Sequence, residues 1–510
     1  MHRNFAVPFF CETLRLLQML LVRAAAPLYN AIEIRLKKAF SMQPSVRDSL
    51  PRGEHFLSRE PAFYKSFFRL FLLLTLQNIV TYSVNVADNV MLGSFSQTAL
   101  SGAAAVNQLQ YVLQQLINMG LCEGLIMLAS QYWGRNDTDA IRRLTGIALC
   151  LGWAAGLLLT LAAFLFPRAL VGLFTDDAAI LAQGVAYLSI LRLSYPVFIT
   201  TLILLAALRS MQIVSIAFRL SVMTLLVNAG INFVLIFGRF GFPCLGVRGA
   251  AIGTLIARCL ELLVLLLYIR KSRLPVRPAS DKPPRVSRAL LGDFLRVSLP
   301  CCVSSLLFSS AVAMQTAILG HLSADALAAN SAAGTLFQYC KMIPISASAA
   351  AGVFIGRVIG SGDLSGLRGY VRTLQVLFLC IGLLVCALLL AISRALLSLY
   401  ALTPQALAYA RQIILVLSIT SIGTAYEMPS MCGICRGGGD SRFVMCMDIF
   451  FSCCVVVPLS LCAAFVLRLD IASVVFFMNC DQILKCIPVF IKTNRYTFIK
   501  KLARTGAEKR

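Results

Sequence analysis

The sequence is poor in charge, and poorest in acid. Only 13% of its 510 residues are charged, and 22 Asp and Glu stand against 46 Lys and Arg. A soluble domain carries about 25% charged residues, so this composition excludes an ordinary soluble protein. Mostly apolar stretches, each long enough to cross a bilayer as a helix of roughly 20 residues, recur along the whole chain. The mean hydropathy is +0.81. We therefore predict an all-α polytopic membrane protein.

Histidine is scarce, and the cysteines form no recognisable site. The three histidines, His2, His55 and His321, fall in tails or a loop, which argues against a membrane-embedded enzyme with a histidine-based site. The 18 cysteines lie mostly inside apolar runs, and no CxxC motif pairs with a second one or with a nearby histidine. They are interpreted as small apolar side chains. We expect no enzyme activity, no cofactor and no structural metal.

The net charge of +24 is explained by membrane topology. The basic residues sit between apolar segments instead of forming one stripe, so no nucleic-acid partner is expected. Alternate loops carry arginines, and the intervening loops 93–103 and 320–325 contain no Lys or Arg. By the positive-inside rule the arginine-bearing loops and both termini are cytoplasmic, which predicts a multi-pass cell-membrane protein. The predicted inner loops contain Arg135, Arg142, Arg143, Arg209, Arg357, Arg368, Arg372, Arg436 and Arg442.

The chain is divided into five regions, and two of them, the lobes, together hold twelve predicted spans. A basic, amphipathic N-terminal tail (1–62) precedes an N-lobe of six helices (63–270). A proline-rich linker (271–292) leads to a C-lobe of six helices (293–492) and a basic C-terminal tail (493–510). The predicted spans are 66–90, 104–130, 143–166, 180–206, 213–237, 248–269, 293–319, 326–356, 371–392, 406–430, 444–466 and 472–491.

The two lobes repeat each other. Gly93 and Gly320 stand in matching motifs 227 positions apart, and Arg209 and Arg436 have the same separation. Six spans per repeat would place both copies in the same orientation. Parallel repeats of this kind place a substrate cavity between the lobes, near the middle of the membrane.

Ser66 to Gly93 contains one acid, Asp88, preceded by Gln77, Asn78 and Asn85. A carboxylate at membrane depth is costly unless it faces a wet cavity or a partner. Such a group commonly carries ions or protons. The alternative is that Asp88 only marks the end of the helix at the lipid headgroups.

Five motifs resemble those of the multidrug and toxic compound extrusion (MATE) family of secondary transporters. They are VADNVMLG (86–93), ASQYWGRNDTDAIRR (129–143), the long stretch 228–261, CRGGGDSRF (435–443) and DQILK (481–485). The resemblance implies a twelve-helix fold of the multidrug/oligosaccharidyl-lipid/polysaccharide superfamily. It also implies a monomeric antiporter that exports amphipathic, cationic drugs or metabolites by alternating access, in exchange for H⁺ or Na⁺.

Two positions depart from the family pattern. The family proline in the first helix is replaced by Leu73, whereas the matching place in the second lobe keeps Pro300. A first helix that bends on protonation is therefore in question. The sodium-coupled branch has a Glu in its seventh helix, and the interior of the 293–319 span has no acid. A sodium site of that form in the C-lobe is not expected.

The cation-coupling site is predicted in the N-lobe. Asn228 and Asn232 are four residues apart and share one helix face, where their amide oxygens would lie beside Asp88. With Thr254 they would surround one carboxylate, which suits Na⁺ or a proton. The alternative is that both asparagines are ordinary interhelical hydrogen-bonding residues. The matching place of Asp88 in the C-lobe is Gln315.

Other polar residues in the spans are candidates for the cavity or for structural ion pairs. Lys341 is predicted to oppose either Glu427 or Asp448, which the sequence does not decide. Arg258 is expected to pair with Glu261, and Asp481 with Lys485, because helix spacing brings each pair together. The cavity and substrate candidates are Gln77, Glu123, Lys341, Glu427 and Asp448.

A flippase for a lipid-linked saccharide is the main alternative function, because such proteins belong to the same superfamily. Flippases tend to carry an arginine-rich cavity for pyrophosphate, and often extra helices. Here twelve spans are predicted, without extra helices. An antiporter is therefore favoured.

Overall fold

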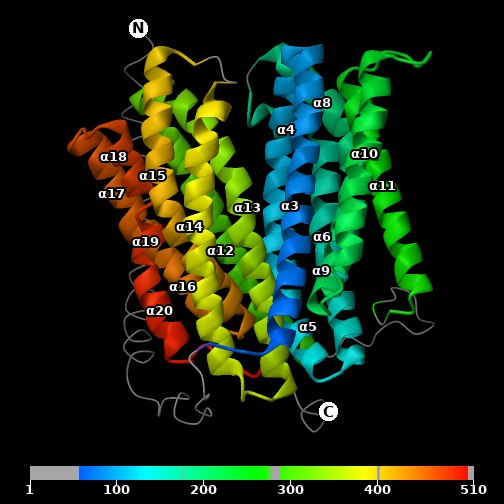
Figure 1. Cartoon of the computed structure of the whole chain (residues 1–510). Coiled ribbons are helices and arrows are strands. Elements are labelled where there is room, and N and C mark those ends of the chain that lie inside the picture. The colour runs from blue at the N-terminus through cyan, green and yellow to red at the C-terminus, as the bar shows by residue number, and fades with distance from the viewer. Residues whose placement is uncertain (1–56, 176, 275, 277–287, 399–401, 504–510) are drawn as a thin grey trace.

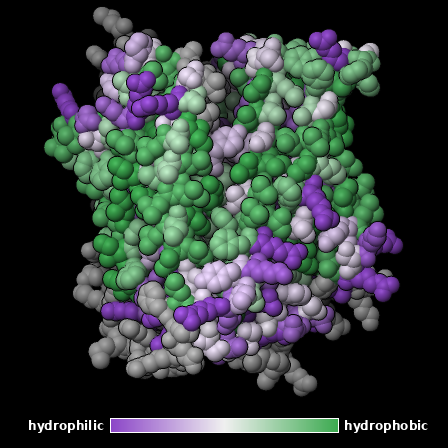
Figure 2. All heavy atoms as spheres, viewed as in Figure 1, coloured by the Kyte–Doolittle hydropathy of each residue, from purple (hydrophilic) through white to green (hydrophobic). Residues whose placement is uncertain are grey.

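The computed structural model describes residues 57–503 except 176, 275, 277–287 and 399–401. Within that part of the chain all regular structure is helical. The helices form two groups that stand side by side (Figure 1). On the face in view, apolar side chains form a band around the middle, with hydrophilic residues gathered towards both ends (Figure 2). This distribution is that of a protein crossing a bilayer.

The first group is the N-lobe, which runs from the first described helix to Lys271. Its helices are α3 (Pro61–Phe95), α4 (Gln97–Gln115), η1 (Leu116–Cys122), α5 (Glu123–Gly134), α6 (Thr138–Leu165), α7 (Pro167–Gly172), α8 (Ala178–Leu191), η2 (Arg192–Ser194), α9 (Tyr195–Ser210), α10 (Ser215–Phe237) and α11 (Val247–Lys271). Here η1 is a π-helical and η2 a 3₁₀ segment, each continuous with its neighbouring helices.

The second group is the C-lobe. Its helices are α12 (Arg288–Leu322), α13 (Ala324–Ser361), α14 (Leu367–Leu397), α15 (Pro404–Met428), η3 (Pro429–Cys435), α16 (Ser441–Ile449), η4 (Phe450–Val456), α17 (Val457–Leu461), η5 (Cys462–Val466), α18 (Ile471–Met478), α19 (Asp481–Leu484) and α20 (Cys486–Asn494). Three of these segments, η3, η4 and η5, are π-helical.

Eleven helices in the described part are long and apolar enough to cross a membrane, and a twelfth span is the bent pair Ile471–Met478 and Asp481–Asn494. The predicted all-α, multi-span fold is confirmed. Several predicted boundaries are too short, because helices continue beyond the apolar core into the polar ends of the molecule. Thus α3 starts at Pro61 instead of residue 66, and α12 starts at Arg288 instead of 293. The N-terminal tail and most of the linker lie outside the described residues.

The two repeats begin their helices with matching caps. Ser96 accepts a hydrogen bond from the backbone of Ala99 at the start of α4, and Ser323 does the same for Ala326 at the start of α13. A side-chain oxygen at this position satisfies a backbone N–H that has no partner within the helix. The repeat seen in the sequence therefore recurs as local structure.

The lobes meet most closely at the end of the bundle that we call the basic end, formed by loops 135–137, 211–214, 362–366 and 436–440. A methyl group added to Gly134 of α5 would lie 2.2 Å from the Arg357 oxygen of α13. A methyl group added to Gly360 of α13 would lie 2.1 Å from the backbone oxygen of Gln131. The two backbones touch because neither glycine has a side chain, which is how membrane helices pack closely.

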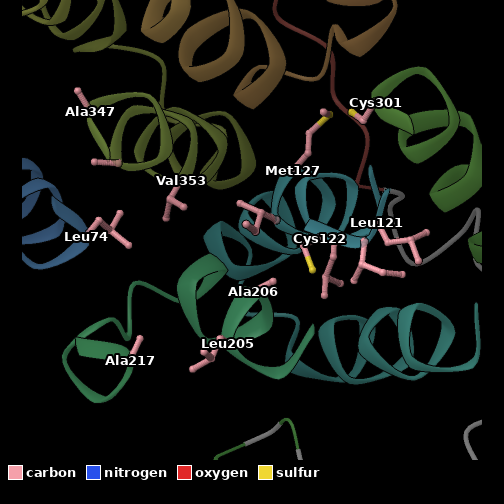
Figure 3. Packing of buried hydrophobic residues seen from close by; sticks show 14 of the residues in the cluster. Leu74, Leu121, Cys122, Met127, Leu205, Ala206, Ala217, Cys301, Ala347 and Val353 are labelled. Carbon is pink, nitrogen blue, oxygen red and sulfur yellow. The ribbon is translucent and has the colours of Figure 1, made fainter. Parts of the chain in front are cut away.

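Buried side chains also surround η1 and α5 elsewhere along their length. Leu121, Cys122 and Met127 of η1 and α5 lie among residues from α9, α12 and α13 (Figure 3). The labelled neighbours come from both lobes, since α9 belongs to the first group and α12 and α13 to the second. Thus α5 is the central element of the interface.

The first helix is continuous through Leu73. Helix α3 has no break between Pro61 and Phe95. Helix α12 is also continuous, although it contains Pro300. Near its start α3 packs on the other lobe, because the Phe63 ring stacks on Tyr370 with centroids 5.1 Å apart. Further along, Asn78 donates to Ser346 of α13 at 3.0 Å.

The C-terminal tail is partly folded onto the protein. We call its described residues 495–503 the strap. Phe498 and Tyr496 are buried, and the backbone N–H of Lys500 donates to the Gly438 oxygen at 2.8 Å. This region was expected only as a basic tail from residue 493. It buries the Tyr496 and Phe498 rings, while Lys500 reaches Asp440.

Exchanging Gly360 for alanine should weaken the contact between the lobes. Overpacking against a backbone typically costs about 1–3 kcal/mol, so the thermal unfolding temperature in detergent should fall. Gly352→Ala on the same helix is the control, because its added methyl would meet its nearest neighbour at an ordinary 3.5 Å. Equal unfolding temperatures for the two variants would contradict the tight contact.

The Asp440 carboxylate should contribute pH-dependent stability. Burial raises its pKa, but Lys492, at 2.9 Å, and Lys500 outweigh burial and hold the pKa below the ordinary value. A lowered folded-state pKa stabilises the protein above the ordinary pKa, and this stability is lost as the pH falls through the folded value. Asp440→Asn should therefore lower the unfolding temperature at pH 7. The unfolding temperature of the variant should also change less with pH in the acidic range. Parallel pH profiles for variant and wild type would refute this.

Candidate functional site

The four residues predicted for cation coupling lie together in the N-lobe. Asn232 of α10 donates to the Asp88 carboxylate of α3 at 2.6 Å and to the Asn228 oxygen at 3.2 Å. Asn228 donates in turn to Thr254 of α11 at 3.3 Å. Both asparagines are essentially buried and Asp88 is half-buried. One hydrogen-bonded chain thus joins three helices to a single carboxylate.

An amide oxygen in this chain has no hydrogen-bond partner in the described part of the molecule. The Oδ1 atom of Asn232 is buried and unpartnered, although its amide nitrogen donates twice. It lies against Gly253, where a methyl group would come within 2.0 Å of it. Buried polar atoms are normally paired, so this oxygen next to Asp88 is available to a ligand.

Arg258 does not form the ion pair that the sequence predicted. No salt bridge joins it to Glu261; it donates to Ser194 at 2.7 Å and its guanidinium lies 4.3 Å from the Phe198 ring centroid. It lies within electrostatic reach of both Glu261 and Asp88. Helix spacing thus brings Glu261 near, but the direct contacts of Arg258 are made with neighbouring helices. The available signal was that Thr254 and Arg258, four residues apart, share a helix face.

Tyr187 of α8 was missed by the sequence prediction. It is buried beside Thr254 and near Asp88. Its segment is mostly apolar and has no motif that marks it, so only the packing of α8 against α11 brings it to the site. It adds a hydroxyl group to the Asp88 cluster.

Gln77 and Glu123 lie away from this cluster. Gln77 is buried on α3, and its side-chain oxygen has no partner among the described residues. Glu123 lines a small hollow, partly open to solvent, together with Arg209 and Arg436. These two arginines are the repeat-related pair. Their charges favour Glu123 as an electrostatic partner of the arginines over contact with a cationic substrate.

The acids and bases of the C-lobe form a separate cluster around Lys485. Its ammonium group lies 3.0 Å from Asp481, the pairing that the helix spacing predicts, and 3.3 Å from Asp448. Asp448 therefore faces Lys485. Glu427 is buried nearby, within electrostatic reach of both Lys485 and Lys341.

Lys341 is held by aromatic rings. Its ammonium nitrogen lies 5.1 Å from the ring centroid of Phe308 and 5.9 Å from that of Phe337, which is the distance of a cation–π interaction. No salt bridge joins it to Glu427 or Asp448. Of the two alternatives left by the sequence, neither is formed as a direct ion pair.

Two parallel lobes, a polar site within the N-lobe and a close contact at one end define a membrane transporter. The sequence profile of the MatE family matches residues 74–234 and 300–462, one match in each lobe. The chain therefore belongs to the MATE family of multidrug efflux transporters, and its relatives and structural neighbours are not enzymes.

Individual relatives agree with this assignment. The probable multidrug resistance protein YoeA of Bacillus subtilis is 23% identical over 81% of this chain and 90% of its own length. The probable multidrug resistance protein NorM of Thermotoga maritima is 24% identical over 76% of this chain and 83% of its own length.

Solved structures share the fold. One, described as the outward-facing conformation of a multidrug resistance MATE family transporter of the MOP superfamily, has a TM-score of 0.76 at 17% identity. The match covers 86% of this chain and 98% of that one. A MOP superfamily transporter from Pyrococcus furiosus has a TM-score of 0.77 at 18% identity, covering 86% and 97%.

Removing Lys485 should destabilise the C-lobe. Lys485→Met leaves the buried Asp481 and the half-buried Asp448 without their cation, and breaking a buried pair costs roughly 3–5 kcal/mol. The thermal unfolding temperature should fall sharply. The double variant Lys485→Met with Asp481→Asn should recover part of the loss, because one uncompensated charge is then gone. A single variant as stable as wild type would show that this cluster is not a structural one.

Proposed function

We propose that this chain is a cation-coupled antiporter that exports small amphipathic cations across the cell membrane, with both termini in the cytoplasm. The observation that carries the proposal is the hydrogen-bonded chain of Asp88, Asn232, Asn228 and Thr254. It gathers one carboxylate and several neutral oxygens at membrane depth. Such a site is costly to maintain and is typical of ion or proton pathways.

Either coupling ion suits the chemistry of this site. A proton would bind the Asp88 carboxylate, and the amide of Asn232 already donates to it. Sodium would need several oxygen ligands, and the unpartnered Oδ1 of Asn232 lies next to that carboxylate. Protein oxygen atoms around a single negative charge are suitable ligands for a hard cation. In both cases occupation of the site neutralises Asp88, which would change how α3 is held against α10.

The C-lobe is a poor place for the same chemistry. The position matching Asp88 holds Gln315, whose amide donates to the Met478 oxygen at 2.8 Å. Asp448 and Asp481 already share the ammonium group of Lys485. Coupling is therefore assigned to the N-lobe.

A saccharide-lipid flippase is the second candidate, and it rests on Arg209 and Arg436 at the hollow. Glu123 lines the same hollow and would repel a pyrophosphate. Transport of a lipid-linked saccharide by reconstituted protein, with no drug cation moved under a proton or sodium gradient, would overturn the antiporter proposal.

Asp88→Asn should abolish gradient-driven transport of a fluorescent amphipathic cation into or out of proteoliposomes. The amide keeps the size of the side chain but removes both the charge and the proton site. Transport rates should be measured under an imposed ΔpH and under an imposed Na⁺ gradient. The gradient that drives transport by the wild type identifies the coupling ion. Gln315→Leu, the repeat counterpart, should retain most of the activity. A wild-type rate in Asp88→Asn would end the proposal.

A further inference from the structure

The strap, residues 495–503, is bound to both lobes. On the C-lobe, Lys500 donates through its backbone to Gly438 at 2.8 Å, and its ammonium group pairs with Asp440. The Phe498 ring lies against Gly438, where an added methyl group would come within 2.3 Å of the ring. Since the strap continues directly from α20, these contacts stay within one lobe.

The contacts with the N-lobe are made by two side chains of the α5 end. Gln131 donates to the Lys500 oxygen at 3.0 Å and accepts from the Leu502 backbone at 2.8 Å, so both ends of its amide are used. Arg135 donates to the Ala503 oxygen at 2.7 Å. Gln131 is only 1% exposed, so these bonds are shielded from water.

The strap therefore crosses the interface where the lobes are in closest contact. Gln131 follows Met127 by one helical turn on α5, and Gly438 follows Gly437 directly; Met127 and Gly437 line the hollow that contains Glu123. The strap thus covers the basic end next to this hollow. Parting of the lobes at the basic end would pull the N-lobe contacts away from a segment anchored on the C-lobe.

We propose that the strap is a latch that holds the basic end closed, and that Gln131 and Arg135 release it each time the basic end opens during transport. The proposal rests on the alternating access that belongs to the proposed function. It adds an element outside the twelve spans that sets how often the basic end opens. A C-terminal segment that merely covered the C-lobe would not require the three hydrogen bonds to α5.

The test measures the distance between the lobes at the basic end. Fluorophores introduced through non-canonical amino acids at Asp139 and Arg442, two exposed positions on different lobes, report opening by single-molecule energy transfer and leave the cysteines in place. Gln131→Ala should raise the ratio of open to closed molecules about fivefold, which corresponds to the net contribution of about one hydrogen bond. A chain ending at Asn494 should open at least as often.

Lys501→Ala is the matched control. Lys501 is the exposed neighbour of Lys500 on the strap and carries the same charge, so this variant should keep the wild-type ratio. Adding a synthetic peptide of residues 495–503 should restore closure to the shortened chain. The same peptide with Lys500 and Phe498 replaced by alanine should not.

Wild-type distances in Gln131→Ala would overturn the latch, even if the shortened chain failed to fold. Opening of Lys501→Ala to the same extent as Gln131→Ala would also overturn the latch, because opening would then not depend on the hydrogen bonds between Gln131 and the strap. Since the distance is measured without a gradient, a failure of cation coupling would leave this result unchanged. The two proposals can therefore fail separately.

Discussion

The architecture depends on the backbone contact between α5 and α13. Gly134 and Gly360 let two main chains touch across the lobe interface, and a single methyl group on either would collide with the other helix. Packing of this kind suits a membrane, where apolar side chains gain little by leaving lipid for one another. It closes the basic end, and it sets the positions of Gln131 and Arg135 towards the strap. Larger residues here would separate the lobes.

The two lobes repeat the same backbone but differ in their buried charge. In the N-lobe, Asp88 accepts a hydrogen bond from the neutral amide of Asn232, with Arg258 nearby and bonded to Ser194. In the C-lobe, Lys485 forms direct ion pairs with two acids. A carboxylate bound by neutral donors can gain or lose a cation, whereas one paired with a lysine is costly to disturb. The lobes therefore share a backbone repeat but hold their buried carboxylates in different ways.

Opening at the basic end would have to overcome more than the glycine contact. Arg135 also donates to Gly360 directly at 3.3 Å, and Arg357 of α13 donates to Gln212 of the N-lobe at 2.7 Å. Each hydrogen bond is worth only about 0.5–1.5 kcal/mol net. Several such bonds can hold a conformation and still yield to the binding energy of an ion or substrate.

The sequence by itself determined the membrane class, the spans and the repeat, because a bilayer demands long apolar helices and leaves a local pattern. It also brought Asn228 and Asn232 to one face, since helix geometry relates residues four apart. Tertiary structure alone decided that Arg258 contacts Ser194, 64 positions away, and that Leu502 contacts Gln131, 371 positions away. Such contacts depend on how helices are packed and rotated against each other, and apolar spans that are buried all round carry no periodic signal of that rotation.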